Sequence, residues 1–515
     1  MKPKLSQGHD NISTKIMKAG IIEVAKPLTY IFNLSLSSGI VPKQLKVATI
    51  EPIHKAGDRG LFNNYRPISI LPAFSKLLEK VMATRLCKFL ESHSLLYKHQ
   101  YGFRKGHATI HPIIHFLNHI AQSNDKPNKE LTIGLFLDLS KAFDTVSHDI
   151  LLKKLNRYGI RGIANDWFRS YLSERVQYTS IGKHVSTRKL STCGVPQGSI
   201  LGPLLFLIYI NDLHNATELN ILTFADDTTA FMSHKCPNEL VRKTNVELRK
   251  IYEWCCVNKL SLNTKKSFFS IYGPKQNITL NETITLKNNI IARVKNDHNS
   301  VAKFLGVYLD EHLTWKFHVN KIRSKISQAI YALNKVKNIL PLSTMKTIYY
   351  SLVHSNLTYG ILAWGNSASA NSLFKLQKKA IRMLNNKKYN SHTEPLFKLN
   401  NILTLKDQYT FEVLTFMFDF INTKLPVSFN NLYSRLNREG IGTRQSLDIL
   451  YPGRPRTKFS EYLPRHVFLK TWNNLEDQYK RIKNRQSFRR MIRDKFVSMY
   501  ANSVQCDNVH CPDCN

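Results

Sequence analysis

The spacing of apolar positions changes along this chain and predicts where helices and strands lie. Over the first fifty residues apolar side chains recur at helical intervals until Pro42, which marks a stop. Short apolar runs bounded by polar residues follow, among them 47–53 and 135–137, and these predict strands. Beyond about residue 320 helical spacing returns, as at Ile326 and Ile330. The sequence therefore predicts a strand-containing first part and a helical C-terminal region.

A hairpin with two acidic residues at its tip is predicted near the middle of the chain. The apolar run 221–225 leads into Asp226 and Asp227, and the chain becomes apolar again at 230–232. Adjacent carboxylates repel and raise each other's pKa unless a cation neutralises them. Either a metal or a basic partner balances this pair, or the two residues serve only the turn.

Asp138 ends an apolar strand upstream, and a helix-like stretch follows it. One interpretation is that this carboxylate simply caps the helix. If the strand lies beside the hairpin in one sheet, however, Asp138 and Asp226 could hold two divalent cations about 4 Å apart, an arrangement used in nucleotidyl transfer. The three carboxylates then predict polymerase chemistry.

A glycine-punctuated loop at 194–204 lies between the two acidic sites and leads into the apolar run 205–210. Glycines allow a backbone to approach a ligand closely, and the Gln197 amide offers a donor and an acceptor to a base or sugar edge. The alternative is a plain turn before a buried element.

Five motifs in this order resemble the successive reverse-transcriptase motifs of non-LTR (LINE-type) retrotransposons, most like the jockey-type group: FLDLSKAFD, GVPQGSILGPLL, FADDT, LSLNTKKS and FLGVYLD. The resemblance begins near residues 10–12, where Asp-Asn-Ile stands for the family's usual Asp-Gly-Ile. It continues through 64–69 and 100–107 to 359–365, and so covers nearly the whole chain.

The resemblance implies an α+β right-hand polymerase of fingers, palm and thumb, with an antiparallel palm sheet and a helical C-terminal extension. The expected divisions are an N-terminal helical extension (1–50), fingers and palm (51–275), a primer-positioning region at the end of the palm (276–320), a basic helical thumb and C-terminal extension (321–500), and a Cys-rich tail (501–515).

The activity implied by the resemblance is RNA-directed DNA synthesis, in which a DNA 3′-hydroxyl is extended with dNTPs on an RNA template. Two Mg²⁺ ions would be held by Asp138 and Asp226, with help from the Leu139 carbonyl, and Asp227 would tune the site electrostatically.

Four further residues match nucleotide-contacting positions of the family, and most have a plainer alternative. Arg66 would contact the triphosphate or form a structural salt bridge, and Gln197 belongs to the loop already described. Phe143 would be a steric gate against the ribose 2′-hydroxyl, a core aromatic, or both. Lys266 would assist the leaving pyrophosphate or neutralise a helix C-terminus.

The charge of the chain independently favours a polyanionic partner. Lys and Arg number 74 against 36 Asp and Glu, a formal net charge of +38. The sequence has neither an apolar run of the roughly 20 residues that a spanning helix needs nor an N-terminal signal pattern, so nucleic acid is favoured over a membrane.

An amphipathic basic helix is expected near residue 490, where Phe488 and Phe496 alternate with cationic residues. These cations would track a phosphate backbone, or they would form a solvated surface: Arg485, Arg489, Arg490, Arg493 and Lys495.

The cysteines upstream of residue 500 fit no disulfide framework, as expected for a reducing compartment. The tail differs, because Cys506, His510, Cys511 and Cys514 would supply four ligands for Zn²⁺. Adjacent His510 and Cys511 rarely reach the same ion, so the alternative is a disordered tail or an incomplete site.

The sequence leaves two other functions open. One is a nucleic-acid-binding remnant of an element, without polymerase activity. The intact Asp residues and the intact loop at 194–204 count against this alternative. The other is RNA-directed RNA synthesis, which Phe143 disfavours. We expect an intracellular protein, in a nuclear and cytoplasmic ribonucleoprotein, and a DNA-nicking activity is not indicated because about fifty residues precede the fingers. The sequence does not predict the oligomeric state.

Overall fold

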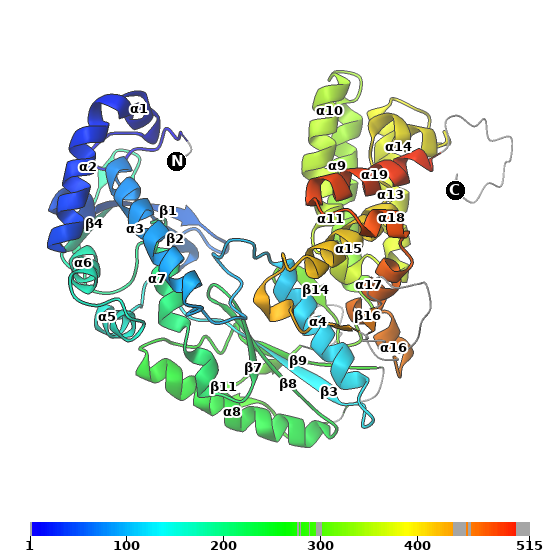
Figure 1. Cartoon of the computed structure of the whole chain (residues 1–515), viewed down its shortest axis with the longest axis horizontal. Coiled ribbons are helices and arrows are strands. Elements are labelled where there is room, and N and C mark those ends of the chain that lie inside the picture. Colours follow the sequence, from blue (N-terminus) through cyan, green and yellow to red (C-terminus); the bar gives the residue numbers. More distant parts are fainter. Residues whose placement is uncertain are drawn as a thin grey trace.

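Two arms rise on either side of a central sheet in the computed structural model, which describes residues 3–274, 278, 280–287, 289–294, 301–435, 450–451 and 455–500 (Figure 1). The described residues up to 294 form one arm and the sheet, and helices from residue 316 onward form the other arm. This arrangement is the expected α+β right hand, with fingers, palm and thumb in that order.

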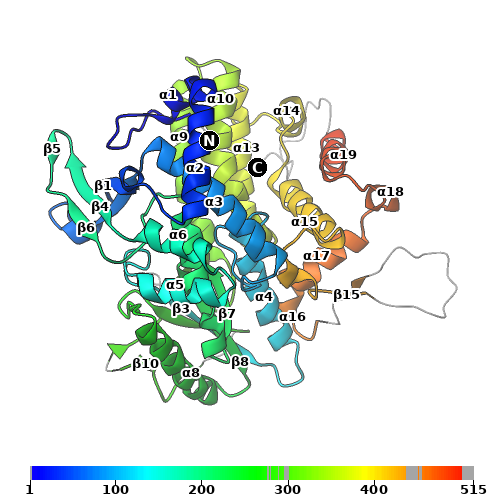
Figure 2. The same cartoon turned by 60° about the vertical axis from the view of Figure 1, so that its left-hand side comes forward.

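The fingers combine helices with a small sheet whose strand order is β2-β1-β4-β5, with β6 also paired to β4. β1 is antiparallel to β2 and parallel to β4, and the β4–β6 ribbon projects at the edge of the molecule (Figure 2). The elements of this arm are α1 (Thr14–Ala19), α2 (Ile21–Ser38), β1 (Val47–His54), β2 (Tyr65–Ile70), α3 (Ala73–Ser92), α5 (His148–Arg157), α6 (Ile163–Leu172), β4 (Arg175–Ile181), β5 (His184–Val185) and β6 (Lys189–Ser191).

The palm sheet has the strand order β12-β9-β3-β8-β7. Its pairings are antiparallel as expected, except that the two-residue β12 runs parallel to β9. The palm elements are α4 (Ile110–Asn124), β3 (Leu131–Leu137), α7 (Leu201–Ile210), β7 (Asn220–Phe224), β8 (Asp227–His234), α8 (Pro237–Val257), β9 (Phe268–Tyr272), β10 (Thr285–Leu286), β11 (Asn289–Ile290) and β12 (Ala292–Arg293).

The central strand β3 is buried on both faces, which explains its unbroken apolar pattern. Ile133, Leu135 and Leu137 belong to a core shared with α7 and α8. Phe136 points to the opposite core, which contains α4 and extends into the thumb. At Gly134 an added Cβ would lie 2.9 Å from the Phe116 ring of α4, so the glycine lets this helix lie close to the sheet.

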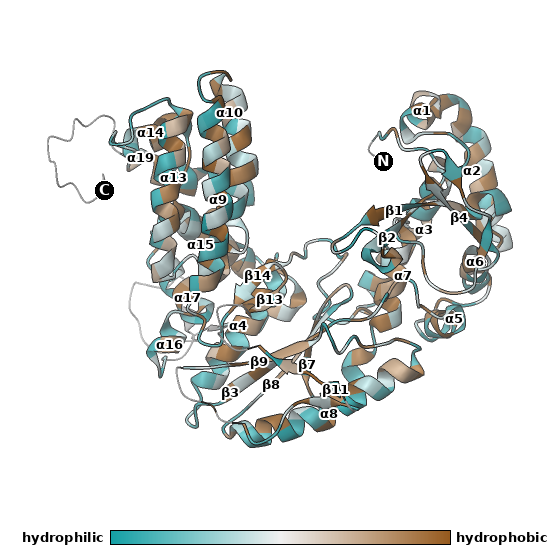
Figure 3. Cartoon of the chain, turned by 180° about the vertical axis from the view of Figure 1, so that it is seen from behind, coloured by the Kyte–Doolittle hydropathy of each residue, from teal (hydrophilic) through white to brown (hydrophobic). Residues whose placement is uncertain are grey.

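The region after the palm begins with a hairpin, β13 (Ala302–Phe304) and β14 (Val307–Leu309), in agreement with the predicted strand and turn. The predicted helical thumb follows. Figure 3 shows hydrophobic and hydrophilic residues interspersed along α9 and α13, as expected for helices with one buried side. The remaining elements are α9 (Lys316–Val336), α10 (Leu342–Ile348), a π-helix (Tyr349–His354), α11 (Ser355–Thr358), α12 (Ile361–Trp364), α13 (Asn371–Leu384), α14 (Glu394–Asn400), α15 (Leu405–Ile421), β15 (Ser434–Arg435), β16 (Leu450–Tyr451), α16 (Lys458–Glu461), α17 (Pro464–Asn473), α18 (Asp477–Lys480) and α19 (Arg485–Ser498). Among the described residues, no helix combines the length and apolar character needed to cross a bilayer.

Candidate active site

Three carboxylates meet where β3 ends and where β7 turns into β8. Leu137, the last residue of β3, pairs with Thr228 of β8, so Asp138 follows the strand next to the acidic turn. Within that turn Phe224 pairs with Asp227, and Asp226 lies at the tip. The structure therefore brings together the three residues that the sequence singled out.

Burial and mutual repulsion raise the pKa values of Asp226 and Asp227. Burial, followed by the charge of Asp138, raises the pKa of Asp226, while Arg66 and Lys55 oppose the shift. Asp227 reaches solvent, yet partial desolvation by the surrounding protein, followed by the charges of Asp226 and Asp138, raises its pKa to about 6. A bound cation would relieve the repulsion between these carboxylates.

The metal ligands predicted from the sequence are two side chains, Asp138 and Asp226, with the Leu139 carbonyl. Across the described residues, no three His, Cys, Asp or Glu side chains are grouped so as to hold one ion. The carboxylate oxygens are hard donors of the kind that Mg²⁺ prefers, and their raised pKa values fit a site that a cation completes. The donor set therefore fits divalent cations without identifying which one.

The backbone at Asp138 is fixed by the segment that precedes β9. The Ser267 hydroxyl accepts a hydrogen bond from the Asp138 N–H at 3.1 Å, and the Asn263 N–H donates to the Asp138 carbonyl at 2.8 Å. Leu139 forms a β-bridge with Leu262. Lys266 is exposed in this same segment, so it lies close in sequence to the groups that hold Asp138, and its role in pyrophosphate release stays a prediction.

The outer edge of β7 is also held, by a segment that the sequence linked to the site only through the resemblance. The Thr223 N–H donates to the His99 carbonyl at 3.1 Å, and the Tyr101 N–H donates to the Thr223 carbonyl at 2.8 Å. Residues 99–101 thus continue the hydrogen bonding of the palm sheet beyond β7.

The glycines of the 194–204 loop approach the protein's own backbone. An added Cβ would lie 2.7 Å from the Asp144 carbonyl at Gly194 (φ 82°), and 2.7 Å from the Ser69 carbonyl at Gly198 (φ 116°). The Gln197 amide donates to Asp144 Oδ1 at 2.9 Å, and its main-chain carbonyl accepts from the Ser69 N–H at 2.6 Å. One of the two Gln197 amide N–H groups therefore has an internal partner, and the predicted contact with a nucleotide stays a prediction.

The far end of the loop is anchored by Glu79, a buried carboxylate of α3 that the sequence did not indicate. Glu79 accepts hydrogen bonds from the Ile200 N–H at 2.7 Å and from the Tyr171 hydroxyl at 2.6 Å. Burial raises its pKa, and the two hydrogen bonds oppose that shift. The loop is thus tied to the fingers twice, to β2 through Ser69 and to α3 through Glu79.

Phe143 is half-buried and makes the contacts of a core aromatic. Its ring stacks on Phe206 of α7, with centroids 4.6 Å apart, and meets Phe103 edge-on at 6.4 Å. These contacts support the core interpretation and leave the steric-gate role as a prediction.

Arg66 is exposed on β2, and within the described part of the chain no carboxylate lies within ion-pair distance of it. The salt-bridge alternative is therefore not observed there. The positive charge of Arg66 lowers the pKa of Asp226, so Arg66 interacts electrostatically with the acidic cluster.

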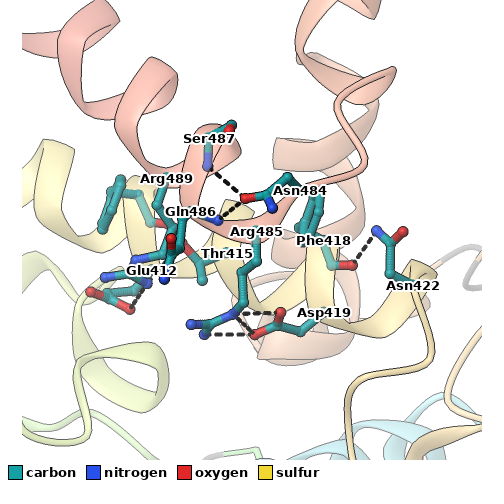
Figure 4. Close-up of polar contacts among 11 residues, drawn as sticks. Glu412, Thr415, Phe418, Asp419, Asn422, Asn484, Arg485, Gln486, Ser487 and Arg489 are labelled. Carbon is teal, nitrogen blue, oxygen red and sulfur yellow. Dashed lines mark hydrogen bonds and ion pairs between the residues drawn. The ribbon is translucent and has the colours of Figure 1, made fainter.

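The basic helix α19 forms as predicted, but the structure gives several of its cations internal partners (Figure 4). Arg485 donates to both carboxylate oxygens of Asp419, at 2.7 to 3.0 Å. Arg489 donates to the Thr415 hydroxyl at 3.2 Å and lies 3.7 Å from Glu412, both on α15.

Of the remaining cations of α19, two have internal partners and one is exposed. Arg493 donates to the Asn401 carbonyl at 3.2 Å, and Lys495 pairs with Glu476. Arg490 is exposed. The phosphate-tracking prediction therefore applies most directly to Arg490, because the other cations also have internal partners.

We expect Arg490→Gln and Arg489→Gln to have different effects. Losing Arg490 should make the log-log salt dependence of RNA affinity shallower by about 0.7, the value for one phosphate contact on single-stranded RNA. Losing Arg489 should instead lower Tm, because it leaves Glu412, whose pKa burial raises, without its cationic partner. Salt titrations and thermal melts of both variants test this, and parallel titration lines for Arg490→Gln and wild type would mean that Arg490 is only solvated surface.

The predicted zinc ligands Cys506, His510, Cys511 and Cys514 lie outside the described residues. The cysteines that the structure describes are unpaired: Cys87, Cys193, Cys236, Cys255 and Cys256.

Comparison with known proteins shows the family of this chain. Residues 53–309, which hold all three carboxylates, match the family described as reverse transcriptase (RNA-dependent DNA polymerase). The probable RNA-directed DNA polymerase from transposon BS of Drosophila melanogaster is 32% identical over 79% of this chain and 45% of that protein. The chain belongs to the reverse transcriptases of non-LTR retrotransposons.

Other relatives of this reverse transcriptase give the same assignment. The RNA-directed DNA polymerase from mobile element jockey of Drosophila melanogaster is 27% identical over 90% of the chain and 50% of that protein. The chain thus spans about half the length of the curated relatives it matches. Among solved structures, telomerase from Candida albicans in complex with a telomeric RNA fragment aligns at a TM-score of 0.36 and 13% identity over 69% of this chain and 66% of that chain, a likeness too weak to support any conclusion.

Proposed function

We propose that this chain is an RNA-directed DNA polymerase that extends a DNA 3′-hydroxyl on an RNA template. The observation that carries the proposal is the position of Asp138, Asp226 and Asp227 at one end of the palm sheet, inside the region that matches the reverse transcriptase family. RNA template, DNA primer and dNTPs are the partners that this activity requires, and the net charge of +38 suits both nucleic acids.

Two Mg²⁺ ions are the proposed cofactor, held by Asp138 and Asp226 with the Leu139 carbonyl. When bound, the ions would lower the pKa of the primer 3′-hydroxyl and neutralise charge on the transferred phosphoryl group. The protein's own contribution is to hold the two carboxylates through separate supports, with Ser267 on the Asp138 backbone and the β7–β8 pairing on the acidic turn. Arg66 and Lys55 would neutralise the incoming triphosphate from the fingers side, since their charges already act on Asp226.

Primer extension by the purified chain tests this proposal. An RNA template with a DNA primer is supplied with dNTPs or with rNTPs in separate reactions. Extension with dNTPs on RNA supports reverse transcription, and preferential use of rNTPs would indicate RNA-directed RNA synthesis. Template binding without any extension, at any Mg²⁺ or Mn²⁺ concentration, would indicate a nucleic-acid-binding remnant.

Phe143→Val is expected to raise the ratio of kcat/KM for ribonucleotides to that for deoxyribonucleotides by about tenfold, because the smaller side chain would leave room for a 2′-hydroxyl. The ratio is measured with matched rNTP and dNTP pairs. Phe206→Val, which opens the same aromatic stack from the side of α7, is the control and should lower Tm with little change in the ratio. Similar ratios in all three proteins would assign Phe143 to the core alone.

A pH dependence follows from Asp227 in the metal-free protein. Its pKa is about 6 in the folded chain against an ordinary value of 3.8, so the folded state binds more protons between these values and its stability falls as pH rises through them. Asp227→Asn should therefore be more stable than wild type above pH 6, by about 1 kcal/mol once solvent screening is allowed for, and no more stable near pH 4.

Mg²⁺ at pH 7.5 should raise the Tm of wild type more than that of Asp227→Asn, because the cation offsets the same repulsion. Glu253→Gln, on the exposed side of α8, removes one charge elsewhere and should respond to pH and Mg²⁺ as wild type does. A Tm difference between Asp227→Asn and wild type that stays constant with pH would contradict this electrostatic role.

A further inference from the structure

The side chain of Gln100 reaches the turn that carries the catalytic carboxylates. Its Oε1 accepts two hydrogen bonds, from the Gly102 N–H at 2.8 Å and from the Ala225 N–H at 3.1 Å. Gln100 is only 2% exposed, and Ala225, the residue before Asp226, is also buried. The carboxamide therefore joins its own backbone segment to Ala225, which lies 125 residues beyond Gln100 in the sequence.

The turn needs such a partner for two reasons. Ala225 has a φ of 59°, a left-handed conformation that costs a residue with a side chain about 1 kcal/mol or more. Its N–H donates to Gln100 Oε1, and a buried N–H without an acceptor would cost about a further 1 to 3 kcal/mol. Without the Gln100 oxygen, the turn would lower its free energy by adopting another conformation. That change would move Asp226 and Asp227.

The segment that carries Gln100 is itself fixed to the thumb side of the molecule. The neighbouring Tyr101 is buried, its hydroxyl donates to the Ser428 hydroxyl at 3.0 Å, and its ring meets Phe429 edge-on at 6.5 Å. Gln100 therefore acts from a support that spans the palm and the C-terminal extension.

We propose that Gln100 is a positioning residue for the polymerase reaction, which holds Asp226 and Asp227 in place by accepting the Ala225 N–H. The proposal rests on the proposed function for its effect on catalysis, but its structural half is independent of activity. In this role the carboxamide acts through the backbone of the turn, at Ala225.

Gln100→Met tests the proposal, because methionine has a similar length and volume but lacks a strong acceptor. Hydrogen–deuterium exchange of the metal-free protein is followed on peptides covering residues 222–228. We expect exchange at the Ala225 amide to be at least about tenfold faster in Gln100→Met than in wild type. Gln100→Glu keeps an acceptor oxygen and should retain protection to within about threefold.

Gln377→Met is the matched control. Gln377 is a buried glutamine of α13 that donates to the Leu403 carbonyl at 3.0 Å, far from the acidic turn in sequence. It should lower Tm and leave exchange at residues 222–228 unchanged. The same comparison in primer extension should show kcat reduced at least about tenfold in Gln100→Met, with a higher Mg²⁺ concentration for half-maximal rate and template affinity within about twofold of wild type.

The outcomes separate the structural role of Gln100 from its effect on catalysis. Unchanged exchange at Ala225 in Gln100→Met, or equal changes in Gln377→Met, would overturn the positioning role whether or not the chain is active. Faster exchange with kcat and Mg²⁺ dependence at the wild-type level would overturn the catalytic half. Absence of extension by wild type itself would refute the proposed function, while the exchange result would still decide whether Gln100 holds the turn.

Discussion

Replacing Asp226 by Asn is expected to lower primer extension at least about a hundredfold while RNA binding stays near the wild-type level. The substitution keeps the size of the side chain and removes the charge that would bind the cation. Because the pKa of Asp226 is raised by burial and by Asp138, loss of its charge should also relieve repulsion, so the variant should be no less stable than wild type. A drop in activity can then be attributed to the site.

The measurement combines single-turnover extension with RNA affinity at several Mg²⁺ concentrations. Glu253→Gln serves as the control for loss of one negative charge and should extend at the wild-type rate. Extension by Asp226→Asn within a few-fold of wild type, at saturating Mg²⁺ and dNTPs, would refute the metal-binding role of Asp226.

The sequence was sufficient for the parts of the fold that depend on local pattern. β3 reads as a continuous apolar run because it is buried on both faces, and the run 221–225 followed by two Asp residues reads as a hairpin because its tip is polar. Asn11 shows how a departure from the family pattern is tolerated: its φ of 56° is a conformation in which Gly is favoured and Asn is accepted.

Partners that are distant in the sequence could not be predicted in this way. The Gln197 amide suits a base or sugar edge, so the sequence indicates either a nucleotide contact or a plain turn; it does not indicate that one of the amide N–H groups donates to Asp144, 53 residues away. The clustered arginines of α19 suggested a phosphate-binding face, whereas Arg485 and Arg489 pair with acidic residues of α15. Charge and periodicity specify what a side chain can bind, and only the tertiary packing specifies which group is present.

Gly102→Ala is the second substitution with a large expected effect. A Cβ at this position would lie 2.2 Å from the Ala225 nitrogen, 2.9 Å from the Ala225 Cα and 2.9 Å from the Phe224 carbonyl carbon. All three are backbone atoms of the acidic turn, so neither a rotamer change nor a flexible side chain can relieve the clash. Either residues 99–102 separate from β7, or the turn moves together with Asp226 and Asp227.

We therefore expect Gly102→Ala to lower extension by about a hundredfold or more and to lower Tm by several degrees. Gly20→Ala is the matched control, because the nearest non-neighbouring atom to a Cβ there is a Glu23 carboxylate oxygen 3.9 Å away, and it should leave both quantities near wild type. Thermal melts and single-turnover extension at saturating template separate the two effects. Because the clash acts on the turn itself, activity should stay low at temperatures well below the Tm of the variant. Recovery of the wild-type rate in the cold would instead mean that Gly102 matters only for global stability and that the turn accommodates the added methyl group.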